Sequence, residues 1–148
     1  MRLVAVFFGL FFINLTLVAQ TDANPAVWSH EVHKLSDTEY ELVFKGKIMD
    51  DWHVYSQYTA EGGSMPSEFT FEKAGEDYEL IGSAEESETI KEYSDVFEVE
   101  ETFFKKEAIF TQKIKLLKPD GRQITVNLFY HICNCLLYTS YASDELTL

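Results

Sequence analysis

The residue best suited to chemistry is Cys133, one of two cysteines in the chain. Its thiolate would attack disulfides or bind soft metals. His131 lies two residues earlier, at the spacing that puts both side chains on one face of a strand, and an imidazole there would favour the thiolate. Cys135 follows at the same spacing. A Cys-x-Cys bridge on an extended strand is strained, so a reactive thiol or a metal ligand is favoured over a structural disulfide.

The element that must position Cys133 is the stretch 123–133, QITVNLFYHIC, in which two rows of residues alternate. One row is Ile124, Val126, Leu128, Tyr130 and Ile132, and the other is Thr125, Asn127, Phe129, His131 and Cys133. A period of two, rich in β-branched and aromatic residues, predicts a strand with its first row in a core. Cys133 then stands at the strand end, off the core face, where a scaffold presents reactive groups to solvent.

The rest of the chain favours short strands joined by turns. Alternating or aromatic stretches predict strands at residues 27–34, 39–49, 52–56, 68–72, 78–83, 99–104 and 108–117. Turn chemistry falls at 36–38, 105–107 and 119–121, while the acidic residues 84–94 fit a strand, a helical turn or a loop. No long stretch has helical periodicity. The chain is therefore predicted to be all-β, a single antiparallel β-sandwich.

The N-terminus and the charge indicate an exported protein. Residues 1–19 combine a short basic start, an apolar run and a small residue before a polar segment, which predicts a secretory signal peptide cleaved near Ala19; a membrane anchor is the alternative. The chain carries 25 Asp and Glu against 12 Lys and Arg, a net charge of −13. This charge argues against nucleic-acid binding and favours solubility after export.

Several local patterns follow one another in a recognisable order. They are residues 48–55 (IMDDWHVY), 62–66 (GGSMP), 69–71 (FTF), 95–97 (DVF), the hairpin 103–116 and residues 129–134 (FYHICN). In order and spacing they resemble the N-terminal, exported domain of the thiol:disulfide interchange protein DsbD family. The likeness covers most of residues 20–134, which we expect to be the mature domain.

The resemblance implies an immunoglobulin-like β-sandwich that carries a redox cysteine pair, with Cys133 as its first member, and no cofactor. Such a domain is one part of a protein-disulfide reductase: it passes electrons to oxidised thiol proteins in the periplasm. A thioredoxin-like domain recharges it, after electrons cross the membrane through a transmembrane domain of the same polypeptide. The resemblance also makes Phe97 the aromatic residue of a cap loop that shields the cysteines, with His53 and Tyr55 flanking them.

The chain departs from the family pattern directly after Cys133. The family continues through several polar residues to its second cysteine, whereas here Asn134 leads into residues 135–140, CLLYTS. This string resembles a translated sequencing-library adapter. It predicts that residues 135–148 are not native, that Cys135 is incidental, and that the native second cysteine is missing.

Each of these residues also has a plainer interpretation. Cys133 could be an inert buried thiol, Phe97 a core residue, His53 and Tyr55 strand packing, and His131 a polar residue on a half-exposed strand. The whole chain would then be a β-sandwich binding module without chemistry. A soft-metal site made by His131, Cys133 and Cys135 with His30 or His33 is a third reading, although no metal is expected. The acidic clusters 85–86 and 98–101 are predicted to be solvated faces.

Overall fold

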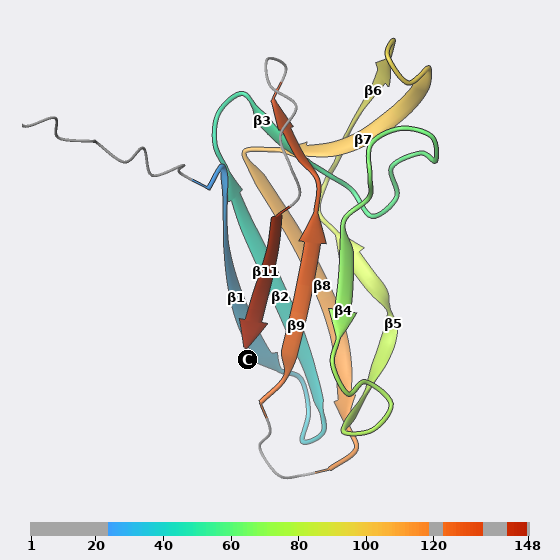
Figure 1. Ribbon diagram of the computed structural model, residues 1–148. Helices are drawn as coiled ribbons and strands as arrows, with labels where there is room; N and C mark the ends of the chain where they lie inside the picture. The colour runs from blue at the N-terminus through green and yellow to red at the C-terminus, as the bar shows by residue number, and fades with distance from the viewer. Residues whose placement is uncertain (1–23, 119–122, 135–141, 148) are drawn as a thin grey trace, which may run out of the picture.

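The computed structural model describes residues 24–118, 123–134 and 142–147, and within these ranges it contains strands and turns but no helix (Figure 1). The strands are β1 (Ala26–Lys34), β2 (Glu39–Ile48), β3 (Trp52–Tyr55), β4 (Glu68–Phe71), β5 (Tyr78–Glu86), β6 (Ile90–Ser94), β7 (Val99–Lys105), β8 (Glu107–Leu116), β9 (Thr125–Tyr130), β10 (Ile132–Asn134) and β11 (Ala142–Thr147). The prediction of an all-β chain is confirmed, and so are most of the predicted strands to within a few residues.

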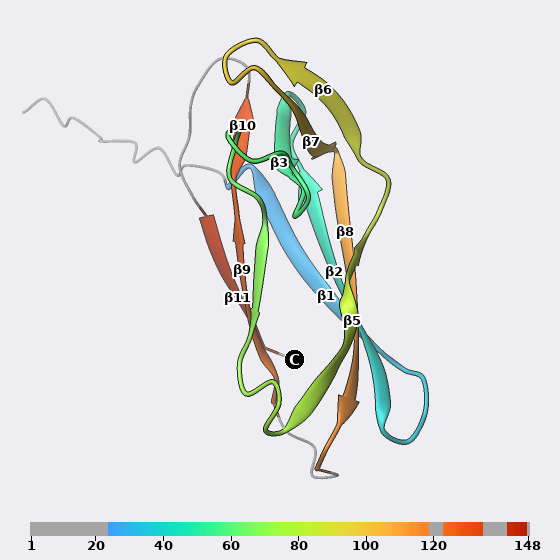
Figure 2. The same ribbon diagram turned by 90° about the vertical axis from the view of Figure 1, so that its right-hand side faces the viewer.

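Among the described residues the strands pair antiparallel in three sheets, with the orders β1-β2-β8-β5, β11-β9-β4 and β10-β3-β7-β6. Figures 1 and 2 show the first two sheets as facing layers. Ring contacts join the layers, because Phe69 of β4 lies 5.2 Å from Phe44 of β2 and 4.9 Å from Phe110 of β8, measured between ring centroids. This is the predicted antiparallel, immunoglobulin-like β-sandwich.

The core contains the apolar row that the alternation of residues 123–133 predicted. Ile124, Val126, Leu128, Tyr130 and Ile132 are all buried, while the row that includes His131 and Cys133 is half-buried. Burial of this row drives the strand to present its other face outward, because successive side chains point to opposite faces. The core therefore fixes the face on which the Cys133 thiol lies.

The predicted single strand 123–133 is divided at His131. β9 pairs with β4 and β11, whereas β10 pairs with β3, so the chain changes sheets at this residue. The alternation continues through the change, which is why the sequence pattern gave no sign of it. The segment 84–94, for which the sequence favoured no single structure, is mostly strand: β5 extends to Glu86 and β6 begins at Ile90.

The third sheet forms one end of the molecule, where the β6–β7 hairpin projects from the sandwich (Figure 1). β7 leads into β8 through a tight turn in which Lys106 adopts a left-handed backbone conformation, φ 69°. β3 lies between β10 and β7 in the sheet. This arrangement brings Cys133 of β10 to the same end of the molecule as the hairpin.

A close packing contact joins β1 to the core. Trp28 of β1 stands opposite Gly46 of β2, and a Cβ atom on Gly46 would lie 2.7 Å from the Trp28 ring. The indole fills this space and reaches Tyr130 at 5.3 Å and Phe110 at 5.9 Å between ring centroids. Gly46 thus lets an aromatic residue of one strand bridge both layers.

None of the described residues belongs to a helix that is long and apolar enough to cross a membrane. The predicted signal peptide at residues 1–19 lies outside the described residues.

Candidate functional site

Cys133 lines a surface pocket of about 370 Å³ at the end of the molecule that carries the β6–β7 hairpin. We call it the thiol pocket. The residues used below are Cys133 of β10, His53 and Tyr55 of β3, Glu101 and Phe103 of β7, and Phe97 of the β6–β7 turn. Four of the five predicted site residues, Cys133, His53, Tyr55 and Phe97, thus line one pocket although they lie far apart in the sequence.

Strand pairing places Cys133 directly opposite His53. β10 and β3 are antiparallel with Cys133 facing His53 in register, and the Tyr55 N–H donates to the His131 carbonyl at 3.1 Å. Opposite residues of an antiparallel pair have Cβ atoms roughly 4.5–5.5 Å apart on one face of the sheet. The thiol itself donates a hydrogen bond to the Asn134 carbonyl at 3.2 Å.

An aromatic cluster surrounds this pair. His53 Nε2 and the Tyr55 hydroxyl are 2.9 Å apart, and the His53 ring lies 4.7 Å from the Phe103 ring. Tyr55 also stacks on His131, with 5.1 Å between ring centroids and 22° between planes. His131 is not among the residues that line the pocket, so His53 is the histidine that shares the pocket with Cys133.

Both imidazoles favour their neutral form. Burial lowers the pKa of His53, and the Lys105 ammonium lowers it further, against the opposing effect of Glu101 and Glu92. Burial also lowers the pKa of His131, with Glu101 acting in the opposite direction. A neutral imidazole can accept a proton, whereas a protonated one cannot.

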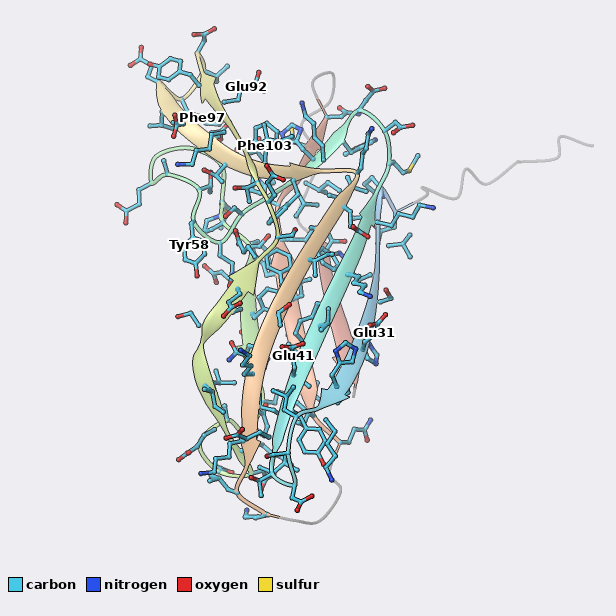
Figure 3. The ribbon with its side chains drawn as sticks, turned by 180° about the vertical axis from the view of Figure 1, so that it is seen from behind. Glu31, Glu41, Tyr58, Glu92, Phe97 and Phe103 are labelled. Atoms are coloured by element: carbon cyan, nitrogen blue, oxygen red, sulfur yellow. The ribbon has the colours of Figure 1, made fainter. Side chains whose placement is uncertain are left out.

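Phe97 lies in the turn of the β6–β7 hairpin, half-buried at the edge of the thiol pocket (Figure 3). Its N–H donates to the Ser94 hydroxyl at 3.4 Å, and the next residue, Glu98, has a left-handed φ of 58°. Its neighbours Tyr93 and Val96 are 61% and 75% exposed. Phe97 is thus a turn residue that lines the thiol pocket rather than part of the buried core.

Comparison with known proteins identifies the fold. No family model and no curated protein sequence matches the chain. Among solved structures, the N-terminal periplasmic domain of ScsB from Proteus mirabilis matches with a TM-score of 0.58 and 15% identity, over 88% of this chain and 48% of that one. The reduced N-terminal domain of Neisseria meningitidis DsbD matches with a TM-score of 0.52 and 17% identity, over 82% and 83%. The chain has the fold of the DsbD N-terminal domain.

Two further solved structures share this fold. One is the complex of the DsbD and PilB N-terminal domains from Neisseria meningitidis, with a TM-score of 0.51, 16% identity and 81% and 80% coverage. The other is the GAE domain of yeast GGA1, with a TM-score of 0.50, 9% identity and 87% and 96% coverage. The chain spans about half the length of the ScsB domain. The DsbD-type fold is therefore shared with a protein outside the DsbD and ScsB group.

Sequence reasoning missed Glu101, which lines the thiol pocket. The predicted solvated face at 98–101 is wrong at Glu101, which is 7% exposed and accepts a hydrogen bond from the Ser64 N–H at 2.8 Å. The alternation of the sequence could have revealed this, because one face of β7 carries Glu101, Phe103 and Lys105, and all three line the thiol pocket. A carboxylate in that row had to face the same way as the phenylalanine.

The other acidic cluster also contains a structural residue. Glu86 is half-buried, and its two carboxylate oxygens accept hydrogen bonds from the Ser56 hydroxyl at 2.6 Å and the Gln57 N–H at 2.7 Å. These bonds fasten the end of β5 to the segment after β3. The prediction of a solvated face therefore holds for the exposed Glu85 and not for Glu86.

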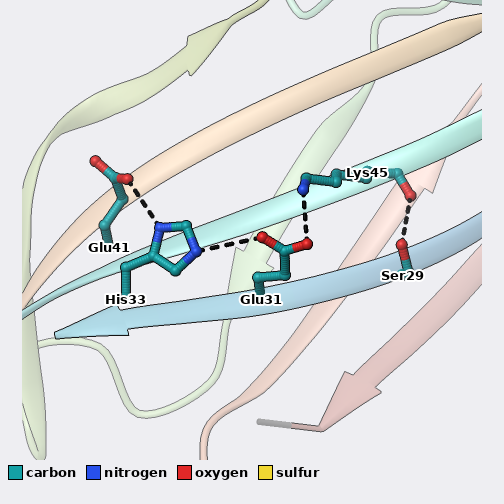
Figure 4. A network of polar contacts seen from close by, with 5 residues as sticks. All are labelled: Ser29, Glu31, His33, Glu41 and Lys45. Carbon is teal, nitrogen blue, oxygen red and sulfur yellow. Dashed lines mark hydrogen bonds and ion pairs between the residues drawn. The ribbon is translucent and has the colours of Figure 1, made fainter.

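The histidines of the soft-metal alternative lie on different elements, since His131 stands between β9 and β10. His30 and His33 belong to β1, and His33 Nε2 and Nδ1 lie 3.2 Å and 3.5 Å from carboxylate oxygens of Glu31 and Glu41 (Figure 4). Lys45 also contacts Glu31, at 2.6 Å. Within residues 24–118 and 123–134 no three His, Cys, Asp or Glu side chains converge as a metal site would require. Cys135, on which the alternative depended, lies outside the described residues.

Proposed function

We propose that this chain is an exported thiol–disulfide interchange domain in which Cys133 is the attacking thiol. The observation that carries the proposal is the position of Cys133: it lies in β10, directly after the last residue of the buried row, and it lines a pocket of a DsbD-type fold. His53, Tyr55 and Phe97 form the walls of that pocket. Cys133, Phe97, His53, Tyr55 and His131 are the proposed site residues, with Phe97 as the cap.

The proposed chemistry transfers two electrons as a pair of bond exchanges. The Cys133 thiolate attacks one sulfur of an oxidised partner, the partner's disulfide breaks, and its second sulfur leaves as a thiolate and takes up a proton. A second cysteine of the domain then attacks the mixed disulfide. The partner departs with two thiols, and the domain keeps the new disulfide until a donor reduces it.

The proposed partners follow from the fold neighbours. A DsbD N-terminal domain has been solved with the PilB N-terminal domain, and we propose a thioredoxin-like domain as a partner of this chain. A transmembrane electron-transfer domain would supply the electrons, and oxidised periplasmic thiol proteins would receive them. Residues 1–19 would direct the chain to the periplasm. The pocket requires no cofactor for this exchange, because protein sulfur carries the electrons.

The chain as given should begin exchange without completing it, because residues 135–148 are proposed not to be native. Incubated with an oxidised thioredoxin-like protein, it is expected to accumulate a covalent complex that dithiothreitol releases. Cys133→Ser should abolish the complex. Replacing residues from 135 onward with a segment that carries a second cysteine some five residues after Cys133 should restore turnover.

The control for this experiment is Cys135→Ser, which should leave complex formation through Cys133 intact. Denaturing electrophoresis with and without reductant measures the complex, and mass spectrometry locates the linkage. Catalytic turnover by the unaltered chain, or a complex that survives Cys133→Ser, would show that Cys133 is not the sole competent nucleophile.

The second candidate function is a β-sandwich binding module without redox chemistry. The exposed Tyr93 and Val96 at the β6–β7 hairpin and the shared fold of the yeast GGA1 GAE domain favour it. Titration against defined thiol–disulfide buffers, in a chain with the second cysteine supplied, separates the candidates. A reversible two-electron couple supports interchange, and a thiol that stays reduced at every potential supports the binding module.

A further inference from the structure

Strand pairing, rather than a flexible loop, holds His53 and Cys133 opposite one another. Cys133 and His53 are register partners on β10 and β3, and both line the thiol pocket. The two strands are short but are held on either side, since β3 also pairs with β7 and β10 follows the buried Tyr130. A nucleophile and a base need this kind of fixed, close arrangement.

Tyr55 determines which nitrogen of His53 is available. The 2.9 Å contact with the Tyr55 hydroxyl occupies Nε2. The ring edge that carries Nδ1 remains for other contacts, and a histidine's two nitrogens are set in opposite roles by the hydrogen bond that one of them makes. With Nε2–H donating to Tyr55, Nδ1 presents a lone pair that can accept a proton.

In the resting state the Cys133 thiol proton is directed at a backbone carbonyl. The Cys133 thiol donates to the Asn134 carbonyl, and a carbonyl accepts a hydrogen bond but cannot remove the proton. The attacking species is the thiolate, so a proton acceptor inside the pocket would speed exchange. Of the charged groups that line the pocket, Lys105 is a cation, Glu101 already accepts the Ser64 N–H, and Glu92 is an exposed residue of β6.

We propose that His53 is the proton acceptor for Cys133, a role that rests on the proposed interchange function. Nδ1 takes the thiol proton as Cys133 attacks one sulfur of the partner's disulfide. The partner's disulfide bond breaks, its second sulfur leaves with the electron pair, and the His53 imidazolium gives that sulfur the proton. One S–S bond forms, one breaks, and the proton count is unchanged.

Several charged or titratable groups face His53 from the surrounding elements, and they affect its pH dependence. They are Tyr55 of β3, Glu92 of β6, Glu101 and Lys105 of β7, His131, and Cys133 of β10. Burial and Lys105 lower the pKa of His53. The imidazole is thus neutral and able to accept a proton in the neutral pH range, and it loses this ability as the pH falls.

The test measures mixed-disulfide formation with the uncharged probe hydroxyethyl disulfide, by mass spectrometry from about pH 5 to pH 9, in a Cys135→Ser background. At pH 7, mixed-disulfide formation should be about 10-fold slower or more in His53→Gln than in the chain that keeps His53. This reduction is smaller than the ~10²–10⁴-fold typical of general acid–base catalysis, because a few per cent of a thiol is already ionised at this pH. The acid-side bend set by His53 should disappear from the pH profile. His30→Gln, an exposed histidine of β1, is the matched control and should follow the unsubstituted chain.

The outcomes separate the two proposals. Equal rates, or a slower His53→Gln with a pH profile of unchanged shape, overturn the role of His53 and leave interchange standing. A Cys133 that reacts with the probe in neither protein overturns interchange and the role of His53 with it.

A second measurement does not depend on His53→Gln folding correctly. NMR titration of the imidazole in the unsubstituted chain and in Cys133→Ala reports the pKa of His53 directly. Ionisation of a Cys133 thiol next to Nδ1 places a negative charge beside the ring, so the His53 resonances should show a second inflection in the pH range where the thiol ionises, and Cys133→Ala should remove it. The absence of this second inflection from the unsubstituted chain overturns the pairing.

Discussion

At the scale of single residues, Phe97 and Phe104 show how one side-chain type takes two roles. Phe104 is 1% exposed in the core, 5.3 Å from the Phe110 ring, whereas Phe97 lies in a turn at the thiol pocket. Sequence reasoning could not separate these roles, because a Phe in an alternating stretch and a Phe in a short acidic loop look equally apolar. The strand–turn boundary at 95–98 makes the distinction.

Phe97→Ala is expected to speed alkylation of Cys133 by iodoacetamide several-fold while changing the free energy of unfolding little. Removing the ring opens the pocket edge but leaves no core cavity. The matched variant Phe104→Ala should cost roughly 3–5 kcal/mol, the range for a buried phenylalanine. Alkylation kinetics and urea unfolding measure the two effects. A Phe97→Ala that is strongly destabilised and alkylated no faster would place the cap elsewhere.

The two half-buried imidazoles, His53 and His131, predict how stability depends on pH. Their pKa values lie below 6.5 in the folded chain, so the unfolded chain binds more protons as the pH falls through that value. Stability is then fully present above about pH 6.5 and decreases as the pH falls toward the folded pKa values. Urea midpoints at about pH 5 and pH 7.5 should differ less in the double variant His53→Gln, His131→Gln than in the unsubstituted chain. An unaltered difference would assign the acid sensitivity to other groups.

At the scale of elements, the contact of Trp28 with Gly46 determines how β1 is attached. Gly46→Ala puts a methyl group where the indole ring lies, so the ring or the strand must shift. Overpacking of this kind costs typically about 1–3 kcal/mol. Lys47→Ala, on the next and exposed position of β2, should stay within about 0.5 kcal/mol. Chemical denaturation measures both, and equal stabilities would mean that the Trp28 ring moves aside without loss.

The strands also show which features the alternation of the sequence can predict and which it cannot. Alternation located β2, β8 and the buried row of residues 124–132 because one face of each strand packs on the core. It could not place the change of sheets at His131, since a period of two survives when a strand exchanges partners. It likewise could not decide residues 84–94, where an exposed edge segment has no apolar row to reveal its period.

At the scale of the whole molecule, the acidic charge should select among small disulfides. The chain carries a net charge of −13, and Glu92 and Glu101 line the thiol pocket beside a single cationic pocket residue, Lys105, among those that the structure describes. Cystamine, a dication, should therefore react with Cys133 about 10-fold faster than the dianion of Ellman's reagent does, relative to their rates with a small free thiol.

Salt provides the check on this expectation, because the screening length falls from about 10 Å at 0.1 M to about 3 Å at 1 M. The preference should shrink at high salt, and Glu92→Gln should reduce it at low salt. A preference that 1 M salt leaves intact would reflect the shape of the pocket instead of its charge.

The thiol pocket has core residues behind Cys133 and a projecting hairpin on its other side, and this difference affects how such a protein can change during evolution. On the thiol side, Tyr130 and Ile132 are core residues, so substitutions that move Cys133 also threaten folding. Across the pocket, Tyr93, Val96 and Phe97 belong to a projecting hairpin whose exposed tip contributes nothing to the described core cluster. Mutations there can accumulate at little cost in stability. The position of the reactive sulfur is thus under strong selective constraint, whereas the hairpin surface that a partner would contact can change more freely. Partner preference could therefore evolve while the fold stays the same.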